Sequence, residues 1–177
     1  MTQCNVTRNP LEVNMKPRFD VDEESVDETT YKQLIGSLRF LCNSRPELMY
    51  GVGLLSQFMS SPQKSHLIAA KRVLRYVKGT TNYCILFLYG MQKDELKLVG
   101  YTNSDFGGDQ VERKSTSGNI FFLNTTPISW SSKKQTIVAL SSCEAEYVAG
   151  YHAVCQGVWF NEVLKDLKVQ IEKPFVL

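Results

Sequence analysis

The first part of the chain carries apolar residues at helical spacing. From Tyr31 onward they recur every three or four residues, and prolines and glycines interrupt the pattern at intervals. Ser61 followed by Pro62 is typical of a helix start, and Gly79 is typical of a helix end. The pattern predicts three helices, at about 31–42, 46–59 and 62–79.

Beyond Gly79 the pattern changes to short alternating or continuous apolar runs separated by turn residues. These runs read YCILFLY, LKLVGYT, NIFFLN, PISWSS and TIVAL, and each predicts a strand. From Ser141 the pattern is helical again until about Leu167, with Ser141 and Glu144 placed as a capping box. The final VQIEKPFVL looks like the beginning of one more strand.

This order of elements predicts a mixed α/β fold in three parts. Residues 1–28 have scattered apolar positions, two prolines and an acidic run, which indicate an irregular lead-in, docked or partly mobile. Residues 29–80 form a helical region, and residues 81–177 combine antiparallel strands with one long helix.

Composition is that of an ordinary globular protein. The chain has 177 residues, 43% of them hydrophobic and 21% charged, which suits one large domain or two small ones. It has no apolar run long enough to cross a bilayer and no signal-peptide pattern at its start. We therefore expect a cytoplasmic protein without a membrane partner. The five cysteines are widely spaced, which favours reduced thiols over a zinc site.

The net charge of +2 conceals a separation of charges along the chain. Acidic residues crowd positions 20–28, whereas the third predicted helix carries only cations on its polar side. Lys71, Arg75 and Lys78 share one face of that helix. Further cations flank an acid-free stretch on the predicted hairpin turns: Arg113, Lys114, Lys133 and Lys134. Two basic patches on a nearly neutral protein predict a polyanionic partner.

Candidate chemistry is concentrated in VGYTNSDFGGD, residues 99–109. Asn103 and Asp105 emerge at a strand end beside a glycine turn, where polar side chains can reach a ligand. Further on, Glu144 and Glu146 stand two apart in the first turn of a helix and point in different directions. Because Glu144 has the capping role, Glu146 is the candidate ligand. From spacing alone, turn and capping roles explain these acids better than a metal site does.

Two longer blocks are specific enough to indicate a family. They read GYTNSDFGGDQVERKSTSGNIFFLN and PISWSSKKQTIVALSSCEAEYVAG. Both resemble the ribonuclease H domain of copia-type retrotransposon polyproteins, with its GYSDADWAGD, RKSTSG, SWSSKKQ, VALSS and EAEY motifs. The preceding YKQLIGSLRFLCNSRPELMYGVGLLSQFMSSP resembles the region that joins reverse transcriptase to that domain. The resemblance implies a ribonuclease H-like mixed sheet, truncated at its C-terminal strands, after a helical connection region.

The resemblance implies hydrolysis of RNA in a duplex, with two Mg²⁺ or Mn²⁺ ions held by carboxylates. By motif, the first catalytic Asp of the family falls on Asn103 and its catalytic Glu on Glu146, with Asp105 at an accessory position. The third catalytic Asp of the family follows a strand that would start near Leu177, so we expect it to be absent. Asp105 or Asp109, which lie on one turn, could replace it as a metal ligand.

Asn103 departs from the family pattern in a way that matters for activity. An amide keeps the size and one acceptor oxygen of a carboxylate but lacks the negative charge that attracts Mg²⁺. We therefore expect this form to be inactive. Either natural decay or an introduced Asp-to-Asn change explains the amide, and the well-kept surrounding blocks favour an introduced or very local change.

The resemblance also sets the expected partners. The chain is similar to a domesticated plant member of the family that acts in mosaic-virus resistance as a double-stranded RNA nuclease. We expect double-stranded RNA first, RNA/DNA hybrid second, and contact with a viral replication complex. Phosphates would be contacted, with little sequence preference, by eight residues: Lys71, Arg75, Lys78, Arg113, Lys114, Ser115, Lys133 and Lys134. The alternatives are a non-catalytic duplex- or protein-binding remnant and an unselected pseudogene fragment.

Overall fold

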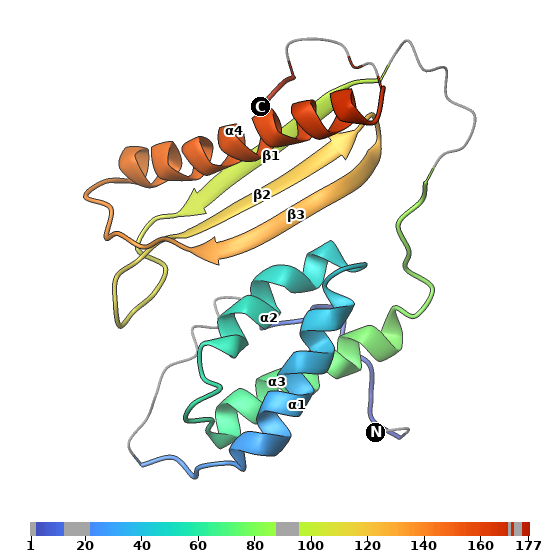
Figure 1. Ribbon diagram of the computed structural model, residues 1–177. Coiled ribbons are helices and arrows are strands. Elements are labelled where there is room, and N and C mark those ends of the chain that lie inside the picture. The colour runs from blue at the N-terminus through green and yellow to red at the C-terminus, as the bar shows by residue number, and fades with distance from the viewer. Residues whose placement is uncertain (1–2, 13–21, 88–95, 170, 172–174) are drawn as a thin grey trace. The chain divides into compact units, whose positions relative to one another are not determined.

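The computed structural model describes residues 3–12, 22–87, 96–169, 171 and 175–177 (Figure 1). The chain divides into two compact units, Met1–Cys84 and Ile85–Leu177. This division lies close to the predicted boundary between residues 80 and 81. Helices in the first unit, and a sheet with a long helix in the second, confirm the predicted mixed α/β class.

The first unit is built from helices around one apolar core. Its elements are α1 (Glu28–Leu41), the 3-10 turn η1 (Pro46–Leu48), α2 (Met49–Ser56) and α3 (Lys64–Gly79). Tyr31, Ile35 and Leu38 of α1 are fully buried against α2 and α3. The Tyr31 hydroxyl donates a hydrogen bond to the Leu55 carbonyl at 3.0 Å, so the one polar group of this buried ring is satisfied.

The predicted start of the third helix was wrong. α3 begins at Lys64 with Gln63 as N-cap, and the Gln63 N–H donates to Nδ1 of His66 at 3.1 Å in a reciprocal capping box. Ser61 and Pro62 do not serve as cap and first residue because the chain before Lys64 pairs with the lead-in. The Val26 N–H donates to the Pro62 carbonyl at 2.9 Å.

The described part of the lead-in is docked on the helices. The Val6 side chain packs on Gly79 so closely that a Cβ at Gly79 would lie 3.0 Å from Cβ of Val6. At the other end of α3, the Glu23 carboxylate accepts hydrogen bonds from the Ser65 N–H at 2.5 Å and from its hydroxyl at 2.7 Å. Of the two expectations for residues 1–28, docking is confirmed for the described residues.

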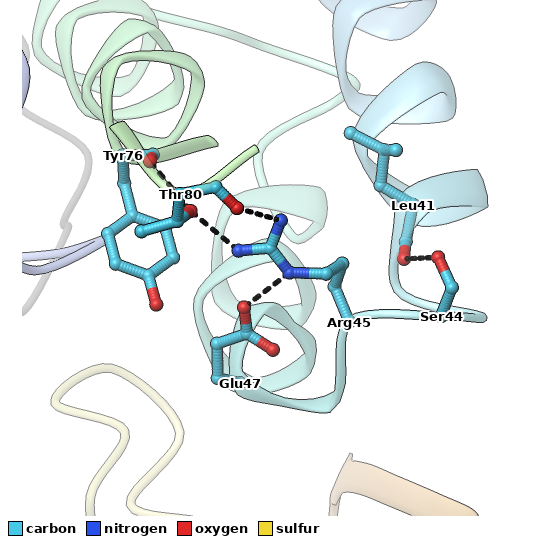
Figure 2. A network of polar contacts seen from close by, with 6 residues as sticks. All are labelled: Leu41, Ser44, Arg45, Glu47, Tyr76 and Thr80. Atoms are coloured by element: carbon cyan, nitrogen blue, oxygen red, sulfur yellow. Dashed lines mark hydrogen bonds and ion pairs between the residues drawn. The ribbon is translucent and has the colours of Figure 1, made fainter. Parts of the chain in front are cut away.

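A buried guanidinium connects η1 to the end of α3 (Figure 2). Arg45 is 8% exposed, and its Nε donates to the Glu47 carboxylate at 2.6 Å. Its two terminal nitrogens donate to the Thr80 carbonyl at 3.1 Å and to the Thr80 hydroxyl at 2.6 Å. The Thr80 hydroxyl donates in turn to the Tyr76 carbonyl at 2.9 Å. Arg45 therefore satisfies the polar groups left where α3 ends.

The second unit contains an antiparallel sheet of three strands in the order β1–β2–β3. The strands are β1 (Leu98–Asp105), β2 (Thr116–Leu123) and β3 (Thr126–Lys134). On the outer edge of β1, Val99 forms a parallel bridge with Val176, and the Gly100 N–H donates to the Val176 carbonyl at 2.8 Å. Of the strand predicted in VQIEKPFVL, the structure shows this single bridge at Val176, and residues 170 and 172–174 lie outside the described residues.

Two of the predicted strands were wrong. In YCILFLY, residues 83–87 form no strand, and the rest of that run lies outside the described residues. TIVAL, residues 136–140, also forms no strand, and Ile137, Val138 and Leu140 are exposed. Within the described residues neither run joins the ladder of the sheet, although the Thr126 hydroxyl at the start of β3 donates to the Leu86 carbonyl at 3.2 Å, so β propensity alone does not make these runs strands.

The long helix α4 (Ser142–Asp166) packs on β1 and β2 (Figure 1). Its buried side is a stripe of small residues, Ala145, Ala149, Ala153 and Gly157. The predicted N-cap is confirmed because Oγ of Ser141 accepts from the Glu144 N–H at 3.1 Å. The Glu144 carboxylate reaches one residue further back than in a capping box, to the Leu140 N–H at 2.5 Å. No described helix is both long and apolar enough to cross a membrane.

Replacing Arg45 by Met tests the network at the end of α3. The variant keeps the apolar stem but leaves the Thr80 carbonyl and the Glu47 carboxylate without their donors, so we expect a loss of about 1.5–3 kcal/mol in the free energy of unfolding. Lys32→Met is the matched control because it removes only an exposed pair with Glu28, worth about 0.5 kcal/mol. Urea unfolding followed by circular dichroism measures both losses. Equal losses would contradict the role given to Arg45.

Candidate functional site

Asn103 lies at the end of β1, on the face of the sheet that α4 does not cover. Leu98 packs with Ala153 of α4, and successive side chains of a strand alternate between faces, so Ser104 points to the α4 side and Asn103 to the other. Oδ1 of Asn103 lies over its cross-strand partner Gly118, only 2.7 Å from where a Cβ would be. A side chain at position 118 would therefore displace the Asn103 amide.

Glu146 approaches the same strand from the first turns of α4. Its Oε1 accepts a hydrogen bond from the backbone N–H of Ser104 at 3.0 Å. Of the two acids, Glu146 therefore contacts the strand, whereas the Glu144 carboxylate accepts from the Leu140 N–H. The structure therefore brings Glu146 to the residue next to Asn103, while the Asn103 side chain points to the opposite face.

Gln135, which follows β3, fixes this arrangement and was missed at the sequence level. It is 5% exposed, and its Nε2 donates to the Ala145 carbonyl at 2.9 Å and to the Ser117 hydroxyl at 2.9 Å. The same nitrogen lies 3.3 Å from the Ser104 hydroxyl. One amide thus joins β1, β2 and the start of α4. In the sequence its signal is its place at the end of the SWSSKKQ motif, between a predicted strand and a helix.

Asp105 and Asp109 both organise the turns between β1 and β2. The Asp105 carboxylate accepts the Thr116 N–H. Oδ1 of Asp109 accepts the N–H groups of Val111 at 2.7 Å and Glu112 at 2.9 Å, while its other oxygen forms an ion pair with Lys134. Burial raises the pKa of Asp109, but the Lys134 ammonium and the two backbone donors outweigh that effect and leave the pKa below its ordinary value.

As placed, the candidate ligand side chains do not fit a two-metal centre. Among the residues that the structure describes, no three His, Cys, Asp or Glu side chains are grouped closely enough to hold a metal ion. Asp105 and Asp109 use their oxygens on the turns, Glu146 binds a backbone N–H, and Asn103 faces away from α4. Their catalytic and metal-binding roles stay predictions.

Most of the predicted phosphate contacts on α3 already have partners. Nε of Arg75 donates to the Asn5 carbonyl at 2.7 Å, and Nζ of Lys78 donates to the Cys4 carbonyl at 2.8 Å. The N-terminal segment therefore occupies these two cations. Lys71 is exposed and has no partner within the described part of the chain.

The hairpin cations divide in the same way. Lys114 pairs with Glu112 at 2.7 Å, and Lys134 pairs with Asp109 and, at 3.4 Å, with Glu112. The charges of these two lysines are therefore neutralised by nearby acids. Arg113 and Lys133 are exposed and unpaired among the described residues.

The predicted nucleic-acid contact by Ser115 is wrong. This residue is fully buried, and its hydroxyl accepts the Gly107 N–H at 3.0 Å. A buried hydroxyl that holds the turn has no surface to offer a phosphate.

Comparisons with known proteins give relatives but no family model and no solved structure that matches. The chain is 38% identical to "Retrovirus-related Pol polyprotein from transposon RE1" of Arabidopsis thaliana over 97% of its length, which is 12% of that polyprotein. It is 41% identical to the corresponding polyprotein of transposon RE2, over the whole chain and again 12% of the relative. "Secreted RxLR effector protein 161" of Plasmopara viticola is 45% identical over 74% of the chain and 91% of the effector. The chain thus spans only a small part of the polyproteins but nearly all of the effector.

Asp109→Asn should destabilise the protein in a pH-dependent way. The pKa of Asp109 is lowered in the folded state from 3.8, so its contribution to stability is present above that pH and is lost as the pH falls through the folded value. We expect the variant to lose about 1–2 kcal/mol at neutral pH and the difference from the parent protein to shrink below about pH 3.8. Urea unfolding at several pH values measures this. Asp166→Asn, at the exposed end of α4, is the control that should show no loss.

Proposed function

Because the chain belongs to one family with the segments that it matches in the Pol polyproteins of copia/Ty1-type retrotransposons, we propose that it is a ribonuclease H-like module that acts on RNA duplexes. The proposed substrate is double-stranded RNA, with RNA/DNA hybrid as the alternative. The observation that carries this proposal is the contact of the Glu146 carboxylate with the Ser104 N–H, because it brings the two sequence blocks of the family, one with Asn103 and one with Glu146, together near the end of β1.

For this form of the chain we propose binding without cleavage. Hydrolysis of RNA by this class of fold needs carboxylate oxygens that attract Mg²⁺ or Mn²⁺, and Asn103 offers a neutral amide. The described residues support the same view, because no three of their His, Cys, Asp or Glu side chains are grouped closely enough to hold a metal ion. The proposal is therefore that a carboxylate at position 103 is a precondition of activity.

Exposed cations would supply the affinity for the duplex. Lys71 in the first unit and Arg113 in the second have no ion-pair partner among the described residues, so their charges are available to phosphates. Contacts with phosphates give affinity that falls with salt and carries little sequence information. The proposed place of action is the cytoplasm, where viral replication complexes supply double-stranded RNA.

A non-catalytic binding module is the second candidate. It is favoured by the use of Asp105 and Asp109 as turn-forming groups, because a carboxylate that accepts backbone N–H groups and a lysine is not available to a cation. In this case the acids stabilise the hairpin and the cations alone carry the function.

Asn103→Asp separates the two candidates. With Mg²⁺ or Mn²⁺ present, we expect the variant to cleave matched double-stranded RNA about 100-fold faster than the parent protein, because one charged group at a reacting centre is worth at least that factor. RNA/DNA hybrid and double-stranded DNA are the comparison substrates. The control combines Asn103→Asp with Glu146→Gln and should show no cleavage. If both forms bind duplex RNA and neither cleaves it, the second candidate holds.

The salt dependence of binding tests the exposed cations. Lys71→Gln and Arg113→Gln should each lower the slope of log affinity against log salt concentration by about one, because each removes one phosphate contact. Lys114→Gln is the matched control, since Lys114 is already paired with Glu112. Fluorescence anisotropy with a labelled RNA duplex between low and physiological salt gives the slopes. Equal slopes for all three variants would remove the proposed contacts.

A further inference from the structure

The face of the sheet beneath α4 is apolar near the end of β2 and polar near its start. Near β1, Leu98 and Phe121 pack with Ala153 in a buried cluster. Further across the sheet, the cross-strand pairs Ser117 with Lys133 and Asn119 with Ser131 bring polar side chains together. Side chains of paired residues point to the same face, so these four form a polar surface beside the helix.

A cavity of about 440 Å³ lies over this polar surface. Its sheet side is formed by Ser117, Asn119, Ser129, Ser131 and Lys133, and its helix side by His152, Cys155 and Gln156. The volume falls within the range of small-molecule sites, about 300–1,000 Å³. The cavity is thus large enough for a nucleotide-sized ligand.

The chemistry of the lining favours an oxyanion. None of the described lining residues carries a carboxylate, while hydroxyl and amide groups offer several donors. Lys133 adds an exposed ammonium that has no ion-pair partner within the described part of the chain. An ammonium together with neutral donors is the set that binds phosphate oxygens.

Gln135 prepares part of this lining. Its Nε2 donates to the Ser117 hydroxyl oxygen, which leaves the Ser117 proton free to donate to another acceptor. Oε1 of Gln135 is buried and has no hydrogen-bond partner among the described residues. Such an unpaired buried acceptor is rare in folded proteins, and only a hydrogen-bond donor, not a phosphate oxygen, could pair with it.

We propose that this cavity binds the phosphate group of a ribonucleotide, either free or as part of RNA. Lys133 and the Ser131 hydroxyl take the phosphate oxygens, and the amides of Asn119 and Gln156 take the ribose hydroxyls. The site is separate from Asn103, which lies on the other face of the sheet. Like the proposed duplex contacts, it uses a cation, but it does not depend on duplex cleavage.

Titration of the full chain with AMP, followed by calorimetry, tests the proposal. AMP should bind, inorganic phosphate should bind more weakly, and Lys133→Gln should weaken AMP binding about tenfold through loss of a charged hydrogen bond. Lys114→Gln is the matched control, because Lys114 does not line the cavity and should leave the affinity unchanged. Ser131→Ala, an exposed substitution, should also weaken AMP binding and provides a second variant that keeps the fold.

Alkylation of the cysteines locates the ligand. Cys155 lines the cavity, whereas Cys143 is also exposed on α4 but lies outside the lining, so AMP should slow alkylation of Cys155 only. Peptide mass spectrometry measures both rates. The proposal is overturned if AMP does not bind at millimolar concentration, if Lys133→Gln and Ser131→Ala bind AMP as the parent does, or if Cys155 is not protected.

Competition with RNA identifies the source of the phosphate. If a short RNA duplex displaces AMP, the cavity takes a phosphate of RNA, and if duplex and AMP bind together, it takes a free nucleotide. Both outcomes support a phosphate site. Asn103→Asp should leave AMP binding unchanged, so failure of the cleavage experiment with retained AMP binding would count against the proposed function and not against this cavity.

Discussion

One buried amide determines how the second unit is assembled. Gln135 donates to a carbonyl in the first turn of α4 and to a hydroxyl on β2, and it lies beside a hydroxyl on β1. Because a buried donor is costly to leave unpaired, this nitrogen fixes the start of the helix against two strands at once. The small residues Ala149 and Ala153 then let the helix lie close to the sheet. The position of Glu146 beside Ser104 follows from this anchor.

Periodicity in the sequence located most elements because it reports which side of each one is buried. It placed α1, α4 and β1 to β3, where an apolar face meets another element. It failed for residues 83–87 and 136–140, since a strand also needs backbone hydrogen bonds to a neighbour, and neither run forms a ladder among the described residues. It failed at the start of α3 because the lead-in pairs with Gln63 from far away in the sequence.

The family resemblance grouped Asn103 and Glu146 in one candidate site, and their catalytic roles stay predictions. The structure brings the Glu146 carboxylate to the N–H of Ser104, which is next to Asn103, and this contact was not predicted. Charges were harder to predict, because a cation that looks free in the sequence can meet a distant group. Arg75 binds the Asn5 carbonyl, and Lys134 meets Asp109 only because the turns fold back on β3. Such contacts depend on tertiary geometry that no local pattern contains.

At the outer edge of β1, pairing with another strand competes with the hydrogen bond of the Glu146 carboxylate. Val176 pairs with this edge at Val99, and further along the same edge the Ser104 N–H donates to the Glu146 carboxylate. A backbone N–H at the sheet edge can donate its hydrogen bond either to a neighbouring strand or to a side chain. A strand that continues along β1 from Val176 must therefore evict Glu146 from its backbone partner. Pairing of a further strand with this end of β1 and release of the Glu146 carboxylate would therefore occur together.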